Sequence, residues 1–364
     1  MKSMKRKCLA VGIILLFVGT CVIPAIAQNI KKPSLPSSRG NWLYVGGNGP
    51  GNYSNIQDAI DDASDGNTVF VYDDSAPYNE ILTINRSITL LGENRNSTII
   101  DGSGRNLAVI LIIAENVTVQ GFTVIDSDPS IGIIIRADNT TISNVWIRNI
   151  QNGMIIEALN TTSIIKNCLI QENLIEGASI GVYTDHAWNV TIRNNLLRDH
   201  DAALALIQSF DCTVSANLIM DSHVGLTSFI GAKNLFTQNT ITTCEEGLYL
   251  EASNDQVIHN NFLNVTRTTY FYRYPWFAFM FLSEAHLFPE YEFNHIYLKE
   301  YRIFGSSVWN GNYWNEPRTP PYPIPGWRGI FFIELAYFRG FPPTRFAFDL
   351  HPAQEPYDLP IVPS

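Results

Sequence analysis

A regular repeat of short apolar segments runs through the middle of this sequence and limits the folds that the chain can adopt. Similar six-residue segments begin at Val119, Ile142, Ile165, Ile192, Val214, Phe236 and Ile258. The successive differences in residue number are 23, 23, 27, 22, 22 and 22. A second series of small residues runs in phase with the first and consists of Gly132, Gly153, Gly181, Ala203, Gly225 and Gly247. Each repeat is therefore expected to hold two short strands separated by turns, with no room for a βαβ crossover helix.

Coils of this kind are stable only when they stack, because one coil cannot bury its own apolar side chains. Stacking places equivalent residues about 4.8 Å apart along one axis. The sequence therefore predicts an all-β fold, a single-stranded right-handed parallel β-helix. We expect Asn195, Asn217, Asn239 and Asn261 to form one column of hydrogen-bonded amides. Cys168 is aligned with this column one coil earlier and is interpreted as a small buried residue.

Both ends of a solenoid need a cover. At the front, Ser54–Gln57 is typical of a capping box, and Ile56, Ala59 and Ile60 have helical spacing, which predicts an N-terminal capping helix. The aromatic stretch 270–288 and the Pro-rich remainder predict an irregular C-terminal cap. The predicted organisation is a signal peptide at 1–27, a linker at 28–41, the β-helix at 42–267 and an aromatic, Pro-rich cap and wrap at 268–364.

The start of the chain, 1–27, has the pattern of a secretory signal peptide. An apolar run at 9–23 is followed by Ala25-Ile26-Ala27, which is a small-x-small cleavage site. The run is shorter than a membrane-spanning helix requires, so cleavage is favoured over a membrane anchor. We expect a secreted or cell-surface protein that is not integral to the membrane after cleavage. The basic start of the leader comprises Lys2, Lys5, Arg6 and Lys7.

The mature chain is acidic and has an odd number of cysteines. Of 24 Lys and Arg residues, four lie in the leader, and the remaining 20 against 34 Asp and Glu residues give a mature net charge of −14. Such a surface repels nucleic acid and other polyanions unless cations mediate. Cys168, Cys212 and Cys244 cannot all pair, which excludes a disulfide scaffold. Eight Asn-x-Ser/Thr sequons suit an exported glycoprotein, and their asparagines are Asn52, Asn85, Asn96, Asn116, Asn139, Asn160, Asn189 and Asn264.

Two ends of the repeat region carry segments that resemble a known family. The front segments are 56–60, 65–69 and 88–92, and the closing segments are 310–314 and 321–324. They resemble the NosD-like right-handed parallel β-helix proteins of the pectate-lyase-like superfamily. The resemblance covers roughly residues 42–326 and implies the fold more than an activity. Its name-giving members are linked to copper-site assembly, but the mature chain has no Met/His/Cys cluster of the kind that copper(I) favours, so no copper role is expected.

The repeat brings charged residues together at the turn between the two strands of each coil. Asp199 lies one repeat before Asp221, and Asp201 is followed at the same spacing by His223 and Glu245. Acids beside an imidazole can abstract a proton from a sugar ring. The candidate catalytic residues are therefore Asp199, Asp201, Asp221 and His223.

Other residues of this turn complete the predicted patch. Arg198 would neutralise a uronate carboxylate, Glu245 is a further candidate binding residue, and Glu172 and Glu246 are expected in the same register. His200, Ser222 and Cys244 would form a parallel column. The patch could hold a calcium ion between coils, but no cofactor or metal site is predicted. Turns of a solenoid are also polar simply because they face water, and this remains the simpler explanation.

A second candidate binding pair is Asp185-His186, at the end of the strand Gly181–Thr184. It is similar to the Tyr-x-Asp-Pro-His pattern of alginate-type epimerases, although the proline is absent and the spacing differs. Two functions follow from these observations. The preferred one is a non-catalytic secreted or cell-surface scaffold that contacts carbohydrate or protein. The alternative is a polysaccharide-active lyase, epimerase or hydrolase that uses the Asp/His patch.

Overall fold

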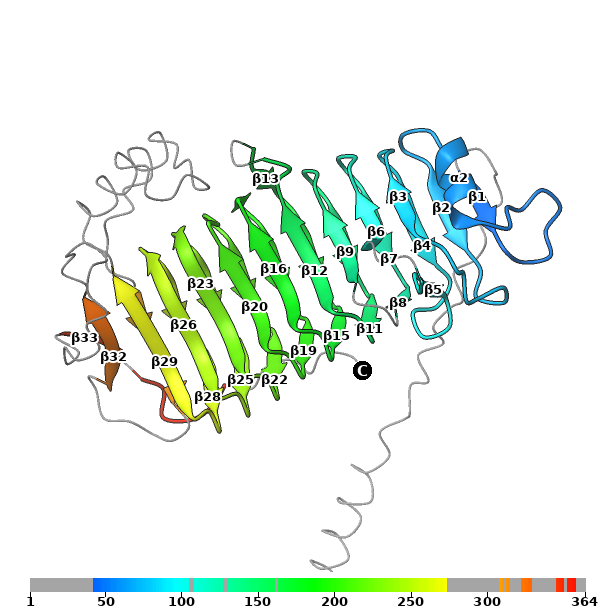
Figure 1. Ribbon diagram of the computed structural model, residues 1–364. Helices are drawn as coiled ribbons and strands as arrows, with labels where there is room; N and C mark the ends of the chain where they lie inside the picture. The colour runs from blue at the N-terminus through cyan, green and yellow to red at the C-terminus, as the bar shows by residue number, and fades with distance from the viewer. Residues whose placement is uncertain are drawn as a thin grey trace, which may run out of the picture. The chain divides into compact units, whose positions relative to one another are not determined.

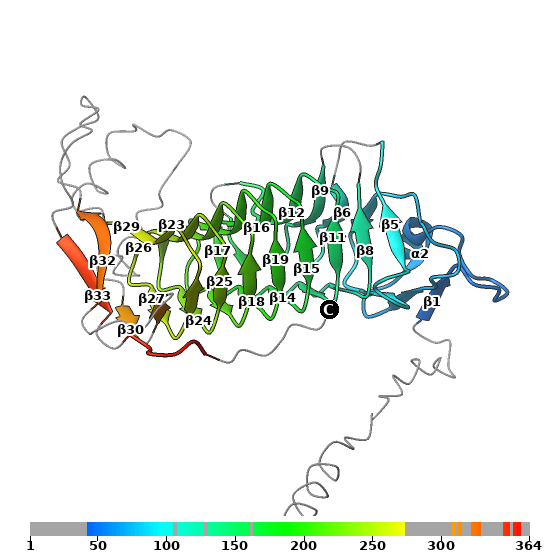
Figure 2. The same cartoon turned by 90° about the horizontal axis from the view of Figure 1, so that it is seen from below.

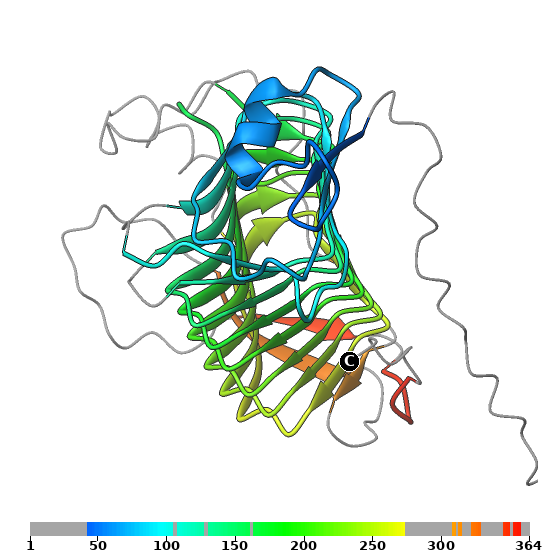
Figure 3. The same cartoon turned by 90° about the vertical axis from the view of Figure 1, so that its right-hand side faces the viewer.

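The computed structural model describes residues 42–104, 108–126, 130–160, 163–273, 308–310, 312–314, 322–328, 345–349 and 352–357. The strands of this part stack in coils and form a parallel β-solenoid, as predicted (Figure 1). Figure 3 views the stack from its N-terminal end, where successive coils lie one behind another. The predicted signal peptide and linker lie outside the described residues. Within the described ranges, no helix is both long enough and apolar enough to cross a membrane.

Three ladders of parallel strands form the walls of the solenoid. The long-strand sheet contains β3 (Leu82–Ile84), β6 (Ala108–Ile112), β9 (Ile131–Ile135), β12 (Asn152–Glu157), β16 (Ile180–Asp185), β20 (Ala202–Ile207), β23 (Val224–Ala232), β26 (Glu246–Ser253), β29 (Arg267–Arg273) and β32 (Tyr322–Arg328). The second sheet contains β1 (Trp42–Val45), β2 (Thr68–Val71), β4 (Thr89–Gly92), β7 (Thr118–Gln120), β10 (Thr141–Ser143), β14 (Leu169–Gln171), β18 (Thr191–Arg193), β21 (Thr213–Ser215), β24 (Leu235–Thr237), β27 (Gln256–Ile258) and β30 (Val308–Asn310).

The third sheet is visible in Figure 2 and contains β5 (Ile99–Asp101), β8 (Thr123–Ile125), β11 (Trp146–Arg148), β15 (Leu174–Glu176), β19 (Leu196–Arg198), β22 (Leu218–Met220), β25 (Thr240–Thr242), β28 (Asn261–Leu263) and β31 (Tyr313–Trp314). Two short strands, β13 (Ile165–Lys166) and β17 (Ala187–Trp188), pair at a corner. A final strand, β33 (Arg345–Asp349), is antiparallel to β32.

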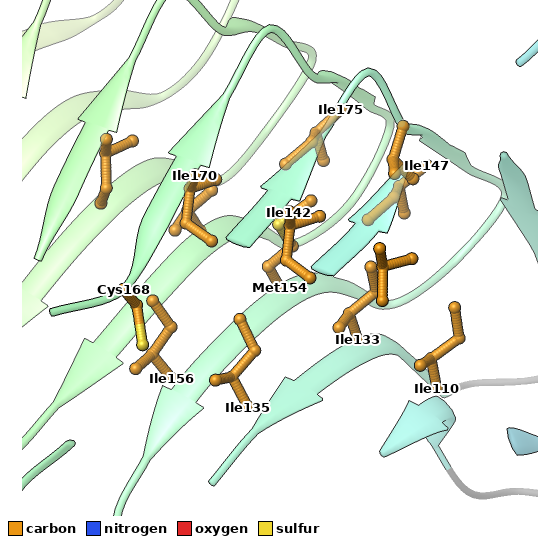
Figure 4. Packing of buried hydrophobic residues seen from close by; sticks show 14 of the residues in the cluster. Ile110, Ile133, Ile135, Ile142, Ile147, Met154, Ile156, Cys168, Ile170 and Ile175 are labelled. Carbon is orange, nitrogen blue, oxygen red and sulfur yellow. The ribbon is translucent and has the colours of Figure 1, made fainter. Parts of the chain in front are cut away.

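The core lies between these walls and is built from the inward-facing residue of each short strand. Ile142, Ile170 and Ile192 stack in register in the second sheet, and each is fully buried. Figure 4 shows how isoleucines from neighbouring coils fill the interior. Burying each such side chain contributes roughly 1.5–3 kcal/mol, so the core grows with every coil that is added.

The pairing register corrects two positions of the predicted repeat. Ile170, rather than Ile165, is the partner of Ile142, and Val257, rather than Ile258, is the partner of Phe236. The differences in residue number at these two steps are therefore 28 and 21. The second predicted series is confirmed, and at Gly153 an added Cβ would lie 2.3 Å from the carbonyl oxygen of Gly181. The backbones of adjacent coils approach too closely there for a side chain.

A ladder of buried asparagines follows the second sheet, and its membership differs from the prediction at both ends. The backbone N–H and the amide of Asn195 both donate to Oδ1 of Asn217, at 3.0 and 2.9 Å. The same contacts link Asn173, Asn195, Asn217, Asn239, Asn260 and Asn312. Every member is at most 1% exposed, so the ladder satisfies polar groups that water cannot reach.

Two residues that were predicted in this ladder lie elsewhere. The step from Phe236 to Val257 in the second sheet is shorter than predicted, so Asn261 lies one position after the ladder residue and begins β28. Cys168 is buried, as predicted, but it is aligned with Val190 and Cys212 rather than with the asparagines. Asn173 takes the place in the ladder that had been assigned to Cys168. The correction follows from the longer step between Ile142 and Ile170.

The predicted N-terminal helix is α2 (Ile56–Asp62), and it covers the first coils with Ile56, Ala59 and Ile60 (Figure 3). The predicted capping box is wrong. The N-cap residue is Asn55, which makes no side-chain cap hydrogen bond. The carboxylate of Glu80 instead accepts from the backbone N–H groups of Ile56 and Gln57, at 2.8 and 3.0 Å. A carboxylate at this position also complements the helix dipole.

The ladder of coils does not end at residue 267. Strands β30 and β31 add another rung, in which Trp309 pairs with Val257 and Trp314 pairs with Phe262. The rings of Phe262 and Trp314 stack at 4.8 Å between centroids, and Trp314 is 1% exposed. Strands β30 and β31 therefore continue the solenoid. Most of the predicted aromatic cap, including 274–307 and 329–344, lies outside the described residues.

Candidate functional site

The predicted Asp/His patch lies at the turn that joins the third sheet to the long-strand sheet. Asp199 and Asp221 follow β19 and β22, and both have left-handed backbone conformations with φ of 60° and 53°. Asp and Asn tolerate this conformation better than most residues, which is a structural reason for acids at these turns. Asp199, Asp201, Asp221 and His223 are all exposed.

The predicted column of Asp201, His223 and Glu245 is confirmed by the register of the strands that follow it. Its side chains bond to neighbouring coils. Ser179 Oγ donates to Asp201 Oδ2 at 2.8 Å, and His223 Nδ1 lies 2.9 Å from Glu245 Oε2. The side chains of His223 and Glu245 are 56% and 47% exposed, so their pairing is worth at most about 1 kcal/mol.

Asp199 and Asp221 also stack one coil apart, as predicted. The backbone N–H of Asp199 donates to the carbonyl of Met220, and the N–H of Asp221 donates to Thr242 O. Thr243 Oγ1 donates to Asp221 Oδ1 at 2.5 Å. The contacts again run from coil to coil along the stack. They hold the turns together.

Arg198 forms an ion pair with Glu176 of the neighbouring coil. Its Nε donates to Glu176 Oε2 at 2.7 Å, and a second guanidinium nitrogen also contacts this oxygen. Glu176 Oε1 accepts from Trp146 Nε1 at 3.0 Å, and the guanidinium of Arg148 lies 4.5 Å from the centre of the Trp146 ring. Sequence reasoning missed Glu176, although it stands one regular repeat before Arg198 and pairs with it in register.

Glu172 had been predicted beside Arg198 and does not belong to the patch. It follows β14, at the turn between the second and third sheets, whereas Arg198 ends a strand of the third sheet. Glu172 was misplaced for the same reason as Ile165: the predicted repeat aligned Ile165, instead of Ile170, with Ile142. Glu246 begins β26 and forms an ion pair with Arg267 at 2.6 Å.

The parallel column of His200, Ser222 and Cys244 is confirmed, but it faces the interior. His200 is 4% exposed, its Nδ1 lies 2.8 Å from Ala178 O, and its Nε2 lies 3.1 Å from Ile175 O. Burial lowers the pKa of this imidazole, although the two carbonyl oxygens act in the opposite direction. Both ring nitrogens contact backbone, so His200 is a structural residue of the corner.

Asp185 and His186 form a separate pair at the opposite edge of the long-strand sheet. His186 Nδ1 lies 2.8 Å from Asp185 Oδ1. Asp185 is the last residue of β16, whereas Asp201 contacts Ser179, just before this strand begins. Six residues of extended chain span about 20 Å, so the two groups do not share a site. Tyr183, two residues before Asp185, is partly exposed on the same outer side of the strand.

The sequon asparagines mark turns, and the fold offers a structural reason for several of them. Asn116, Asn139 and Asn189 have left-handed φ values, and the Thr two residues later begins the next strand of the second sheet. A turn asparagine followed by a strand threonine is therefore a product of the repeat itself. Asn52 is partly buried and bonds to Gly46 O at 2.6 Å. The other seven sequon asparagines are exposed.

A buried carboxyl group that sequence reasoning missed lies near the C-terminal coils. Asp255 is fully buried, and it accepts from the N–H of Asn234 at 2.8 Å and from Ser228 Oγ at 3.0 Å. Burial raises the pKa of Asp255 to about 7, against a hydrogen-bonding contribution that lowers it. Asn234 in turn bonds to the N–H of Cys212. The corrected register would have placed these residues in one buried column.

The described residues do not fit a copper or calcium site. Within the ranges given above, no three His, Cys, Asp or Glu side chains are placed to hold a metal ion. Burial raises the pKa of Cys168 to about 11 and that of Cys212 to about 12, so both are thiols in the buried interior. Met154 is fully buried in the core.

Comparisons with known proteins place this fold among parallel β-helix proteins. The A-module of the mannuronan C-5 epimerase AlgE6 from Azotobacter vinelandii is similar over 60% of this chain and 74% of that one, with 14% identity and a TM-score of 0.47. The XylC–xylose complex is similar over 64% and 68%, with 12% identity and a TM-score of 0.51. The lacto-N-biosidase of family GH136 from Eubacterium ramulus is similar over 65% and 64%, with 12% identity and a TM-score of 0.45.

The 12% identity and TM-score of 0.51 for the XylC complex indicate a shared fold and no more. No curated protein sequence matches the chain significantly. A family model described as periplasmic copper-binding protein (NosD) matches residues 60–319. These residues include most of the coils and three of the five segments whose resemblance was noted in the sequence, 65–69, 88–92 and 310–314. Because the match covers well over half of the sequence, the chain belongs to the NosD family of β-helix proteins.

Proposed function

We propose that the protein is an exported, non-catalytic solenoid that presents its long-strand sheet to a carbohydrate or protein partner. The observation that supports this is the bonding of the predicted catalytic groups. Asp201 bonds to Ser179, Asp221 bonds to Thr243, and His223 bonds to Glu245, each from one coil to the next. Groups that bond along the stack contribute to its regularity and do not converge on a substrate.

The outer side of the long-strand sheet supplies the contact surface. Its central column pairs in register from coil to coil and consists of Leu111, Ile134, Ile155, Tyr183, Ala205, Thr227 and Tyr249. Ile134 and Ala205 are buried, and the other five are partly exposed. Aliphatic and aromatic side chains dominate, although a sheet face toward water is usually polar. A flat surface of this composition suits the faces of sugar rings or the side chains of a protein partner.

Export is part of the proposal. The leader pattern at 1–27 supports it, and so does membership of a family described as periplasmic. The division into a leader, a linker at 28–41, a solenoid and a C-terminal cap and wrap is proposed with it. The exposed sequons provide possible attachment sites for glycans on the exported chain.

The test is proton NMR of a panel of neutral and uronic polysaccharides with the protein, with and without calcium. Binding without turnover broadens ligand signals and produces no new anomeric or unsaturated signals. Tyr183→Ala should weaken binding, whereas Leu235→Ala, an outward leucine of the second sheet, should not. Turnover of any glycan would refute the non-catalytic proposal, and equal effects of the two variants would refute the assigned face.

A polysaccharide-active enzyme is the second candidate, and one contact favours it. The Asp185 carboxylate, 2.8 Å from His186 Nδ1, orients the imidazole as a carboxylate orients a general base. Tyr183 lies on the same face of the strand. If turnover is found, His186→Asn should abolish it, because asparagine tolerates the φ of 53° but cannot accept the proton. The matched variant His223→Asn should retain it.

A further inference from the structure

The guanidinium group of Arg148 lies on the outer face of the third sheet and has no carboxylate partner in the described part of the chain. In the same ranges, Arg136, Arg198 and Arg267 each form an ion pair with a glutamate. Arg148 Nε is buried and makes no hydrogen bond there. Buried polar groups in proteins nearly always have a partner, so each exception calls for a physical reason.

Trp146 holds the Arg148 guanidinium in place. The two side chains point to the same side of β11, and the guanidinium carbon lies 4.5 Å from the centre of the Trp146 ring. Stacking on an aromatic ring fixes the plane of a guanidinium group. Because Nε is buried while the side chain as a whole is partly exposed, the two terminal nitrogens are the donors left for a ligand. Two N–H donors in one plane match the two oxygens of a carboxylate.

Two carboxylates lie one coil away from Arg148, and both are directed elsewhere. On the next coil, Glu176 Oε1 accepts from Trp146 Nε1 at 3.0 Å, and Glu176 Oε2 binds the arginine of the following coil. On the preceding coil, Asp126 is 1% exposed, and its Oδ2 is directed at Gly102, where an added Cβ would lie 3.0 Å away. The terminal nitrogens of Arg148 therefore remain available to an anionic ligand.

The acidity of the chain does not prevent an anionic ligand from binding here. The whole sequence carries a net charge of −10, but charges are largely screened beyond a Debye length of about 8 Å at physiological ionic strength. Asp101 and Asp199 both lie at least two coil steps, about 9.6 Å, from Arg148. In the outward column itself, Arg148 and Arg198 flank Glu176, so positive charge exceeds negative charge on this part of the sheet surface.

An apolar surface lies beside the Arg148 guanidinium. Leu174 and Leu196 begin the two following strands, β15 and β19, and they continue the column of Trp146 in register. Both leucines are partly exposed. They lie two residues, about 7 Å, along the strand direction from the column of Arg148. The C–H face of a sugar ring packs on a flat apolar surface of this kind, with a carboxylate on the ring directed at the guanidinium.

We propose that Trp146, Arg148, Leu174 and Leu196 form a binding site for a uronic acid residue of a glycan, and we call it the uronate site. The terminal nitrogens of Arg148 bind the carboxylate, and the leucines contact the sugar ring. The role predicted for Arg198 is thereby assigned to Arg148, because Arg198 is already paired. The uronate site lies on the third sheet and is separate from the long-strand face proposed above, so neither proposal depends on the other.

The test is isothermal titration calorimetry with trigalacturonate in calcium-free buffer at physiological ionic strength. Galactotriose is the neutral control, and tri-glutamate carries the carboxylates without a sugar ring; the protein should bind trigalacturonate more tightly than either. Arg148→Gln should weaken this binding by about 10-fold or more, because the charged donors are lost. Arg193→Gln is the matched control, since Arg193 is an outward arginine of the second sheet that bonds to Gln171, and it should leave the affinity unchanged.

Several results would overturn the uronate site. One is a failure of trigalacturonate to bind, and another is equal affinity for galactotriose or tri-glutamate. Equal losses in Arg148→Gln and Arg193→Gln would show a general charge effect and would overturn it as well. Arg148→Gln breaks no ion pair in the described part of the chain, so its urea unfolding midpoint should match the wild type. Tyr183→Ala should leave the affinity unchanged; a loss there instead would place the sugar on the long-strand sheet, so the two proposals can fail separately.

Discussion

Two series of polar residues follow the same regular repeat, and they differ in where they lie. The asparagine ladder from Asn173 to Asn312 is buried, whereas the column of Asp201, His223 and Glu245 lies on the outside. In both, the side chains bond to neighbouring coils. The comparison shows that repetition of a polar residue identifies a ladder, and that burial decides how much the ladder stabilises.

Removing one buried rung should have the largest effect. Asn217→Ala leaves the N–H and the amide of Asn195 without their acceptor, and it removes the donor to Ile192 O. Each buried group without a partner costs about 1–3 kcal/mol, so the free energy of unfolding should fall by about 4 kcal/mol. Urea denaturation measures this loss. A loss below about 1 kcal/mol would show that water replaces the missing amide.

Asp255 is a buried polar residue whose contribution to the free energy of unfolding depends on pH. Its pKa is about 7 in the folded chain against 3.8 in the reference state, so the folded chain retains the proton more strongly. Stability from this group is fully present below about pH 4 and is lost as the pH rises toward 7, by about 4 kcal/mol in all.

The matched variant for this effect is Asp255→Asn, which keeps an acceptor for Asn234 and cannot ionise. The difference in unfolding free energy between wild type and variant, measured by urea denaturation from pH 4 to pH 8, should change by that amount in favour of the variant. If the difference does not vary with pH, the pKa of Asp255 in the folded chain is close to its value in the unfolded chain, and burial does not raise it.

A half-buried pair should have an intermediate effect. Glu176→Gln removes the charge that binds Arg198, whose side chain is 43% exposed, while Glu176 itself is 18% exposed. The amide can still accept from Trp146, so the expected loss is about 1 kcal/mol or less. The loss should shrink in high salt, because ions screen exposed charges. A loss that salt does not change would mean that packing, rather than charge, holds this pair.

The outer column should show the smallest effect. His223→Asn breaks the contact with Glu245, but both side chains are about half exposed. The expected change in unfolding free energy is within about 0.5 kcal/mol. Thermal unfolding of this variant beside Asn217→Ala tests the comparison directly. Similar losses in the two variants would contradict the distinction between the buried and the exposed ladder.

The repeat predicts much of the fold, because a solenoid converts sequence spacing into spatial neighbours. It placed His223 beside Glu245 and identified Asn195, Asn217 and Asn239 as one buried ladder. It failed at Ile165 because two overlapping segments, 165–170 and 170–175, both fit the six-residue pattern. A repeat pattern based on strand residues does not show where a turn contains extra residues.

The environment of the candidate site could not be read from spacing alone. A column of Asp, His and Glu has the same spacing whether it converges on a ligand or bonds along the stack. The repeat spacing could have predicted Glu176 as the partner of Arg198. It could not have predicted that Glu80 caps α2, because Glu80 lies in a loop 24 residues after Ile56. Such contacts depend on the folded path of irregular segments.

The step from Asn260 to Asn312 in the buried ladder spans 52 residues, whereas the step from Asn217 to Asn239 spans 22. A rung therefore requires only that its two residues arrive one strand spacing apart, whatever length of chain lies between them. Closing a longer loop costs little, about 0.6 kcal/mol for each doubling of its length. The junction after β29 is consequently a position where evolution, or a protein engineer, could exchange one insertion for another while leaving every other rung in place.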